Sequence, residues 1–469
     1  MRAEYEKNDL FSSPAFRSLR EFVFEARNAG PGDGGTEEFE RELHSRLMAV
    51  GRDLIRDHIA QHDLDAKEIK VGDERFRWKM KSKQQYCGLA GTFEIERNIY
   101  VPVRGPGKAI CHLELRAGIV EGAWTPLAAR VMTRAVASTT PKEASELLEE
   151  IGGMKPSTSS LDRLPKRLSQ VWEEKREEFE EQLRLLDPVP PRAVTVAVCL
   201  DGVQVPMKDA EREEKRSEED KRPQGPAGYR EAGCGTVSLY DAEGERLQTI
   251  RFGRMPETNK RTLKEQLEAE LVSIYLAHPN LTLVCLADAA EDNWTFLSEL
   301  SSRFSPNDIN EAIDLFHVLE KIKGALNAFH GEQTPESKAA FEEFRIFLRE
   351  KDDGAERVIR ALRYRRDKCR GAARKTINDV INYLCKRKER LRYKRLLDRN
   401  LPVGSGVVEA ACKTLASERL KRSGMSWLEE GVQAILTFRS LIQSERWENG
   451  WTLLSSEYQR DVKVSNQAA

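Results

Sequence analysis

A strongly apolar run beginning at Ala193 limits the possible fold more than any other feature of the chain. From Ala193 to Asp201, eight of nine residues are apolar or β-branched. A near-continuous run of this kind is typical of a strand buried on both faces of a sheet, with other elements covering each face. The run ends at Asp201, so a carboxylate is predicted at the end of a central strand. A turn residue is the alternative, because Asp-Gly is a common turn pair.

The same pattern recurs between Leu281 and Asp288, where a second apolar run ends in a carboxylate. A third carboxylate, Glu409, follows a Gly-Ser-Gly turn and lies in the first turns of a predicted helix, where negative charge is favoured. Three converging carboxylates repel each other unless a cation lies between them. Oxygen ligands suit Mg²⁺ or Mn²⁺, so a metal site of Asp201, Asp288 and Glu409 is predicted.

These three acids, with a helical segment between the last two, resemble the DDE triad of bacterial insertion-sequence transposases. The chain resembles in particular the Kra-type group, which is allied to the Mutator-like superfamily, and the resemblance covers roughly residues 194–441. Three further motifs carry it: Asp314-Leu-Phe-His317, Gly404-x-Gly-x-x-Glu409-x-x-x-Lys413, and Arg419-x-Lys421-x-x-Gly424-Met425-x-Trp427.

The resemblance implies an α/β protein with an RNase H-like, mixed-sheet catalytic core interrupted by an all-helical insertion. It implies a transposase that cuts and joins double-stranded DNA, at transposon ends and target, by two-metal in-line phosphoryl transfer. A homo-oligomer in the synaptic complex is the expected assembly. His317 resembles a family residue that contacts the scissile phosphate; a structural histidine bonded to Asp314 is the alternative.

The length of 469 residues indicates two or three domains. We expect a mostly helical N-terminal region with a small β-element, which precedes the core. The proline-rich segment 187–192 marks the boundary before the core. The polar segment from Lys208 to Gly228 is interpreted as a disordered surface loop. The expected regions are 1–125 (N-terminal), 126–186 (helix-turn-helix-like), 190–309 (first part of the core), 310–400 (helical basic insertion) and 401–469 (completion of the core and C-terminal helix).

Two helices separated by Gly152-Gly153 have the outline of a helix-turn-helix, an outline that generic helical hairpins share. If the motif binds DNA, the residues expected to face it are Lys155, Ser157, Ser159, Ser160 and Arg163.

Basic residues dominate positions 357–399, here called the basic block, although the whole chain carries 76 Lys plus Arg against 77 Asp plus Glu. A one-sided charge run indicates a polyanion partner; a solvated helix face is the alternative. Within the block, we expect phosphate contacts from Arg365, Arg366, Lys386 and Arg387. Along the helix after Glu409, residues suited to backbone phosphates are Lys413, Arg419, Lys421 and Arg422.

The eight cysteines are scattered without a Cys-x-x-Cys pair, so no zinc knuckle is predicted. The beginning of the chain lacks the apolar core of a signal peptide, and no apolar run is long enough to span a membrane. We therefore expect a cytoplasmic protein of the bacterial nucleoid without a membrane partner. Two other functions share these features: a nuclease or resolvase on the same core, and a catalytically silent, transposase-derived DNA-binding protein.

Overall fold

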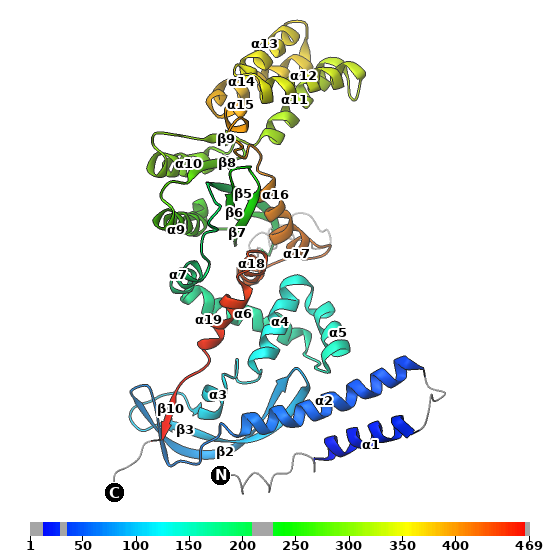
Figure 1. Ribbon diagram of the computed structural model, residues 1–469, viewed down its shortest axis with the longest axis vertical. Helices are drawn as coiled ribbons and strands as arrows, with labels where there is room; N and C mark the ends of the chain where they lie inside the picture. The colour runs from blue at the N-terminus through cyan, green and yellow to red at the C-terminus, as the bar shows by residue number, and fades with distance from the viewer. Residues whose placement is uncertain (1–12, 29–34, 209–227, 465–469) are drawn as a thin grey trace, which may run out of the picture. The chain divides into compact units, whose positions relative to one another are not determined.

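The computed structural model describes residues 13–28, 35–208 and 228–464 (Figure 1). The chain is an α/β protein that divides into two compact units, Met1–Phe179 with Trp447–Ala469, and Glu180–Arg446. The division falls within helix α7 (Arg176–Leu186) rather than in the proline-rich segment. Residues from 447 onward, expected to complete the core, belong to the first unit. Most of the predicted loop, residues 209–227, lies outside the described residues.

The first unit contains a five-stranded antiparallel sheet in the order β10-β1-β2-β3-β4. Its long hairpin accounts for the β-rich composition that begins at Phe76. The C-terminal strand pairs with the first strand of this sheet, which explains why the end of the chain returns to the N-terminal unit. The strands are β1 (Glu68–Val71), β2 (Glu74–Gly88), β3 (Gly91–Pro102), β4 (Ile110–Cys111) and β10 (Val462–Val464).

The remaining elements of the first unit are helices, and several begin at side-chain caps. Thr140 forms a capping box with Glu143, and Ser157 accepts a hydrogen bond from the backbone of Ser160. The helices are α1 (Pro14–Asn28), α2 (Thr36–Ala60), α3 (His112–Ala117), α4 (Pro126–Ser138), α5 (Pro141–Gly152), α6 (Thr158–Glu174) and α19 (Trp447–Ser456).

The second unit is built on a five-stranded mixed sheet in the order β7-β6-β5-β8-β9. Strand β5 (Thr195–Met207) lies at its centre, antiparallel to β6 (Gly228–Tyr240) and parallel to β8 (Thr282–Ala287). Strand β7 (Arg246–Arg254) extends the antiparallel side, and β9 (Glu311–Ile313) extends the parallel side. The predicted central strand is confirmed: Val196, Ala197, Val198 and Leu200 have no exposed surface.

Helices cover both faces of this sheet. A Cβ at Gly235 would lie 2.9 Å from Leu267 on α9 (Arg261–Ala277), and a Cβ at Gly253 would lie 3.1 Å from Leu436 on α18 (Glu429–Gln443). Gly235 and its neighbour Cys234 point to opposite faces of the sheet, and Gly253 shares the face of Cys234, with which it pairs. Helices α9 and α18 therefore lie on opposite faces. The 3₁₀ turn η3 (Thr258–Lys260) precedes α9, and α10 (Glu291–Phe304) packs against β8.

A helical segment connects β9 to the end of the core, as expected from the resemblance. Its first four helices pack against one another in pairs. The segment comprises α11 (Leu315–His330), α12 (Pro335–Glu350), α13 (Gly354–Asp367), α14 (Gly371–Lys386), η4 (Lys388–Leu391) and α15 (Tyr393–Leu397); α16 (Gly406–Ala411), the π-helical turn η5 (Cys412–Ser417) and α17 (Glu418–Leu420) follow it. Within the described ranges, every helix is too short or too polar to cross a membrane.

Candidate functional site

Three aspartates lie at matching positions on three neighbouring parallel strands. Asp201 lies within β5, which continues to Met207, so it neither ends that strand nor forms a turn as the sequence suggested. Leu200 of β5 pairs with Ala287 of β8, and Ala287 pairs with Ile313 of β9. The next residue along each strand is an aspartate, and the three are Asp201, Asp288 and Asp314. The strands run parallel, so these residues lie side by side at one edge of the sheet, here called the acidic edge.

Asp314 connects two segments that are remote in sequence. Its side chain is fully buried, and its Oδ1 accepts a hydrogen bond from the backbone N–H of His317 at 2.8 Å, which caps α11. Its other oxygen accepts a hydrogen bond from the backbone N–H of Ser405, in the turn before α16. Gly404 in that turn packs closely on Phe316, since a Cβ there would lie 3.1 Å from the ring. Asp314 thereby holds the start of α11 against the start of α16.

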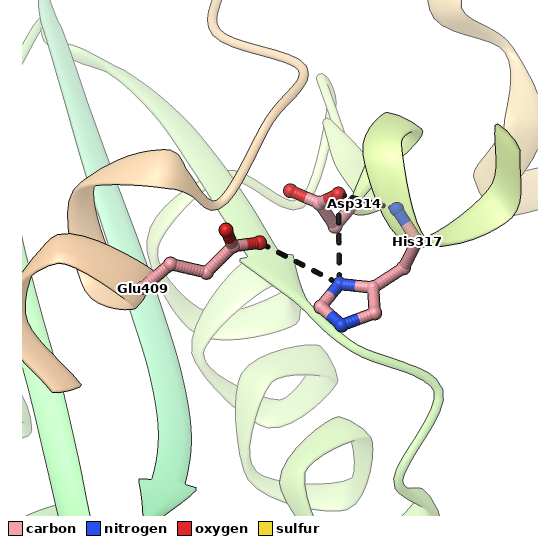
Figure 2. A group of neighbouring side chains, drawn as sticks. All are labelled: Asp314, His317 and Glu409. Carbon is pink, nitrogen blue, oxygen red and sulfur yellow. Dashed lines mark hydrogen bonds and ion pairs between the residues drawn. The ribbon is translucent and has the colours of Figure 1, made fainter. Parts of the chain in front are cut away.

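The side chains of Asp314, His317 and Glu409 form a compact group (Figure 2). Nδ1 of His317 lies 3.6 Å from Oδ1 of Asp314 and 3.6 Å from Oε1 of Glu409. One potential ligand atom from each residue lies within 4.8 Å of the other two. The hydroxyl of Ser405 donates to Oε1 of Glu409 at 3.2 Å and orients that carboxylate.

The ring of His317 is placed for a ligand rather than for a hydrogen bond within the protein. Its Nδ1 is buried and has no hydrogen-bond partner in the part of the chain that the structure describes. Both carboxylate distances exceed hydrogen-bonding range. The ring lies within ion-pair distance of both carboxylates, a geometry that a structural histidine beside Asp314 shares with a metal ligand. A nitrogen between two carboxylates fits a divalent cation that accepts mixed N and O ligands.

Asp201 contacts the helix that carries Glu409. Its Oδ1 accepts a hydrogen bond from the backbone N–H of Gly202 at 2.7 Å, and its Oδ2 lies 3.5 Å from Sγ of Cys412. The neighbouring thiol of Cys234, burial and the charge of Asp201 all raise the pKa of the Cys412 thiol. The thiol therefore stays protonated and donates to the carboxylate.

The sequence analysis did not predict this contact. The available signal was its position three residues after Glu409, which places both side chains on one helix face. A π-helical turn begins at Cys412, and such turns are frequent at functional sites.

Asp288 is directed toward the start of α10. Its Oδ1 accepts hydrogen bonds from the backbone N–H of Ala290 at 3.0 Å and from Nδ2 of Asn293 at 3.4 Å. Among the described residues, the one set of three acids, histidines or cysteines close enough for a shared ion is Asp314, His317 and Glu409. Asp201 and Asp288 lie at the same edge of the sheet but outside that set.

Helix α14 places an aromatic ring and a cation beside the acidic edge. Burial, together with the charges of Asp288 and Asp314, raises the pKa of Tyr383 to about 12 against the opposing effect of Arg387. Arg387 stacks on the Tyr383 ring at 4.8 Å and donates to the carbonyl of Ala289 at 3.1 Å. Of the predicted phosphate ligands, Arg387 is thus the one held next to the acids.

The other predicted residues of the basic block differ in exposure. Arg365 lies over the rings of Phe329 and Phe344, and burial lowers its pKa. Arg366 pairs with Asp367 at 2.9 Å, whereas Lys386 is exposed. Arg365 therefore contributes to helix packing, and Lys386 is the better placed for a phosphate.

Arg419 does not occupy the predicted position along a DNA-facing helix. It is 1% exposed, and its guanidinium stacks on the Trp427 ring at 5.1 Å. The prediction of a phosphate contact is wrong in this structure because the chain folds back after α17. Lys413 and Lys421 are exposed, and Arg422 is half-buried and donates to the carbonyl of Glu418.

The predicted helix-turn-helix outline is present in the first unit as α5 and α6. Gly153 ends α5 in the left-handed conformation, with φ of 65°, and Ser157 caps α6. Lys155 is exposed but pairs with Glu149 at 2.6 Å. Ser157 bonds to the hydroxyls of Ser159 and Ser160. Of the remaining three predicted residues, Ser159 and Arg163 are exposed and Ser160 is half-buried.

Comparison of the sequence with models of known protein families and with curated proteins finds no match.

Proposed function

We propose that the chain is a DDE transposase that cleaves and joins DNA strands with divalent metal ions at the acidic edge. The observation that carries the proposal is the register of three parallel strands, which brings Asp201, Asp288 and Asp314 to matching positions beside the helix of Glu409. Carboxylates gathered at one edge of a sheet repel each other, and a bound metal offsets that repulsion.

The topology of the second unit supports an RNase H-like core for this function. Three antiparallel strands precede two parallel ones, and a helix connects β7 to β8. The helical segment from α11 to α15 lies between the second acid and Glu409, as in the resembled Kra-type transposases. The core thus presents its acids at the carboxyl ends of the parallel strands, where α/β sheets commonly bind ligands.

Within this function, the residues have separable roles. Asp201 and Glu409 would hold the ions, and Asp314 and His317 would complete the coordination on the α11 side. Bound divalent ions would activate a water or a 3′-hydroxyl and stabilise the leaving 3′-oxygen. Arg387, held by the Tyr383 ring and the carbonyl of Ala289, would bind a phosphate of the substrate.

The ligand chemistry favours Mn²⁺ over Mg²⁺ at the His317 side of the site. Mg²⁺ prefers oxygen ligands, while a mixed set with imidazole suits a softer transition ion. Electron paramagnetic resonance of added Mn²⁺ measures this binding without any DNA. We expect binding by the wild type, weaker binding by Glu409→Gln, and unchanged binding by Glu291→Gln, an exposed acid at the start of α10.

The decisive experiment is an in vitro assay on DNA that carries candidate terminal repeats, with Mg²⁺ or Mn²⁺ added. Cleavage followed by strand joining supports the transposase. Cleavage without joining would favour a nuclease or resolvase on the same core. Metal-independent DNA binding without cleavage would favour a silent DNA-binding protein.

A further inference from the structure

The antiparallel sheet of the first unit carries a row of three cations across neighbouring strands. Lys463 of β10 is paired in register with Lys70 of β1, and Lys70 is paired with Arg75 of β2. Arg77 lies two residues further along β2, on the same face. These four residues, Lys463, Lys70, Arg75 and Arg77, are here called the basic sheet face.

This face is open to solvent. Side chains alternate along a strand, and the opposite face carries a hydrophobic cluster of Ile69, Phe76, Tyr100 and Val462. All four cations are exposed. Strands lie about 4.8 Å apart, so the row spans about 10 Å across the sheet.

The charges of this face are poorly matched within the protein. Like charges directly opposite each other on neighbouring strands are destabilising. Lys70 and Lys463 approach only Asp73, at 3.4 Å, and Asp461, at 3.7 Å, and both acids are highly exposed. Within the described ranges, Arg75 and Arg77 form no salt bridge. Glu68, opposite Arg77, is the one acid in register with these cations.

The same strand provides a contrast beyond its bulge. After the register shift between Trp78 and Met80, Lys81 and Lys83 lie on the other face of β2. There each is matched with a glutamate across the hairpin: Lys81 with Glu96 at 3.8 Å, and Lys83 with Glu94 at 3.1 Å. One strand therefore carries a matched and an unmatched set of cations.

We propose that the basic sheet face binds the phosphate backbone of duplex DNA, at a surface separate from the α5–α6 motif and the basic block. The choice of DNA as the partner rests on the proposed function, whereas the row of cations is observed independently of that function. Clustered Lys and Arg gain affinity by releasing counterions from DNA, independently of sequence. A protein partner fits less well, because the centres of protein interfaces are depleted of charged residues and of lysine in particular.

The test compares two double variants of the full chain, Arg75→Gln/Arg77→Gln and Lys81→Gln/Lys83→Gln. Each removes two positive charges from β2. Fluorescence anisotropy measures binding to a labelled duplex of arbitrary sequence over a series of salt concentrations. We expect the first variant to reduce the slope of log K against log salt by about 1.8, at about 0.9 per lost phosphate contact. The second should leave the slope near that of the wild type.

Thermal unfolding of both variants checks that the fold is retained. Equal slopes for both variants would overturn the proposal, as would a wild-type chain that binds no duplex. Binding to phosphatidylserine vesicles that depends on Arg75 and Arg77, with DNA binding unaffected, would assign the face to a membrane instead.

Cleavage and joining are measured on the same samples, so the two proposals fail separately. If the Arg75→Gln/Arg77→Gln variant keeps the wild-type slope and cleavage is active, the sheet-face proposal is rejected and the transposase proposal stands. A reduced slope without cleavage would support the sheet face as a DNA-binding surface and contradict the transposase proposal.

Discussion

The acidic edge and the basic block both concentrate charge of one sign in the second unit, but they differ in whether that charge is paired with opposite charge. The three aspartates of the edge form no salt bridge with lysine or arginine in the part of the chain that is described. Several cations near the end of the block, by contrast, pair with acids outside it: Arg390 with Glu311 at 2.7 Å, and Arg392 with Glu356 at 2.9 Å. Unmatched charge indicates a ligand site, whereas matched charge indicates structure.

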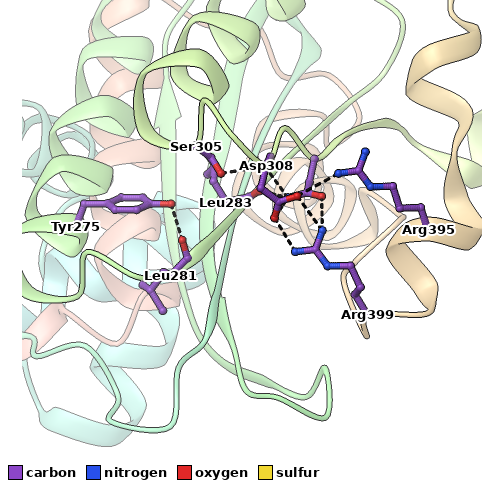
Figure 3. A network of polar contacts seen from close by, with 8 residues as sticks. Tyr275, Leu281, Leu283, Ser305, Asp308, Arg395 and Arg399 are labelled. Carbon is purple, nitrogen blue, oxygen red and sulfur yellow. Dashed lines mark hydrogen bonds and ion pairs between the residues drawn. The ribbon is translucent and has the colours of Figure 1, made fainter.

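Figure 3 shows ion pairs formed by two arginines at the end of the basic block. Asp308 precedes β9 and accepts hydrogen bonds from Arg395 at 3.0 Å and from Arg399 at 2.6 Å. Arg399 also donates to Asn310, which in turn bonds to the carbonyl of Leu283 on β8. These cations fasten the end of the helical segment to the sheet.

The largest expected effect concerns the unmatched acids. Asp201→Asn retains the side-chain volume but removes a negative charge, so we expect cleavage to fall by about 10³-fold. The metal-free fold should be no less stable, because repulsion within the acidic edge decreases. Gel shift with end DNA should show retained binding. Cleavage at the wild-type rate would mean that Asp201 takes no part in catalysis.

The next effect tests whether the matched cations are structural. Arg390 stacks on the Trp294 ring at 4.1 Å and pairs with Glu311, which is 12% exposed. Arg390→Met leaves that carboxylate unpaired, so we expect a loss of about 2 kcal/mol in the free energy of unfolding. Urea unfolding measures the loss.

Lys386→Met is the matched control for that variant, because Lys386 is exposed in the same block. Its stability should change by less than about 0.5 kcal/mol. It should instead reduce the salt slope of DNA binding by about 0.9, while Arg390→Met leaves the slope unchanged. The reverse pattern would show that pairing does not separate structural from binding cations.

A smaller effect is expected for the metal ligands. His317→Ala removes a nitrogen that lies between two carboxylates, so affinity for Mn²⁺ should fall by about tenfold or more. His278→Ala, at the end of α9, is the control for loss of an imidazole. Titration of Mn²⁺ by paramagnetic resonance gives both affinities. Equal affinities for the two variants would exclude His317 as a ligand.

The smallest expected effect is a pH dependence of the stability that the Asp308–Arg399 ion pair contributes. The hydrogen bond from Arg399 lowers the pKa of Asp308 from 3.8 to about 2. A lowered pKa in the folded state adds stability that is present above pH 3.8 and is lost as pH falls through about 2. The stability difference between the wild type and Asp308→Asn should therefore shrink over this range. If the acid unfolding curves of the wild type and Asp308→Asn stay equally separated over this range, the prediction is contradicted.

The local pattern of the chain predicted those features that depend on neighbouring residues. The apolar run before Asp201 predicted the central strand, since a strand buried on both faces has no need for polar alternation. The shorter run before Asp288 predicted β8 in the same way. The Gly-Ser-Gly turn predicted the start of the helix that carries Glu409. Each of these signals lies within about ten residues of the acid that it places.

The tertiary structure alone decided which side chains meet. Asp314 joins Asp201 and Asp288 because three parallel strands share a register, and register is a long-range property. Arg419 is buried because the chain folds back onto Trp427. The end of the basic block pairs with acids remote in sequence, and the row from Lys463 to Arg75 exists only because the last strand pairs with the first. Strand register and ion pairing depend on residues far apart in the chain, so no local pattern could have revealed them.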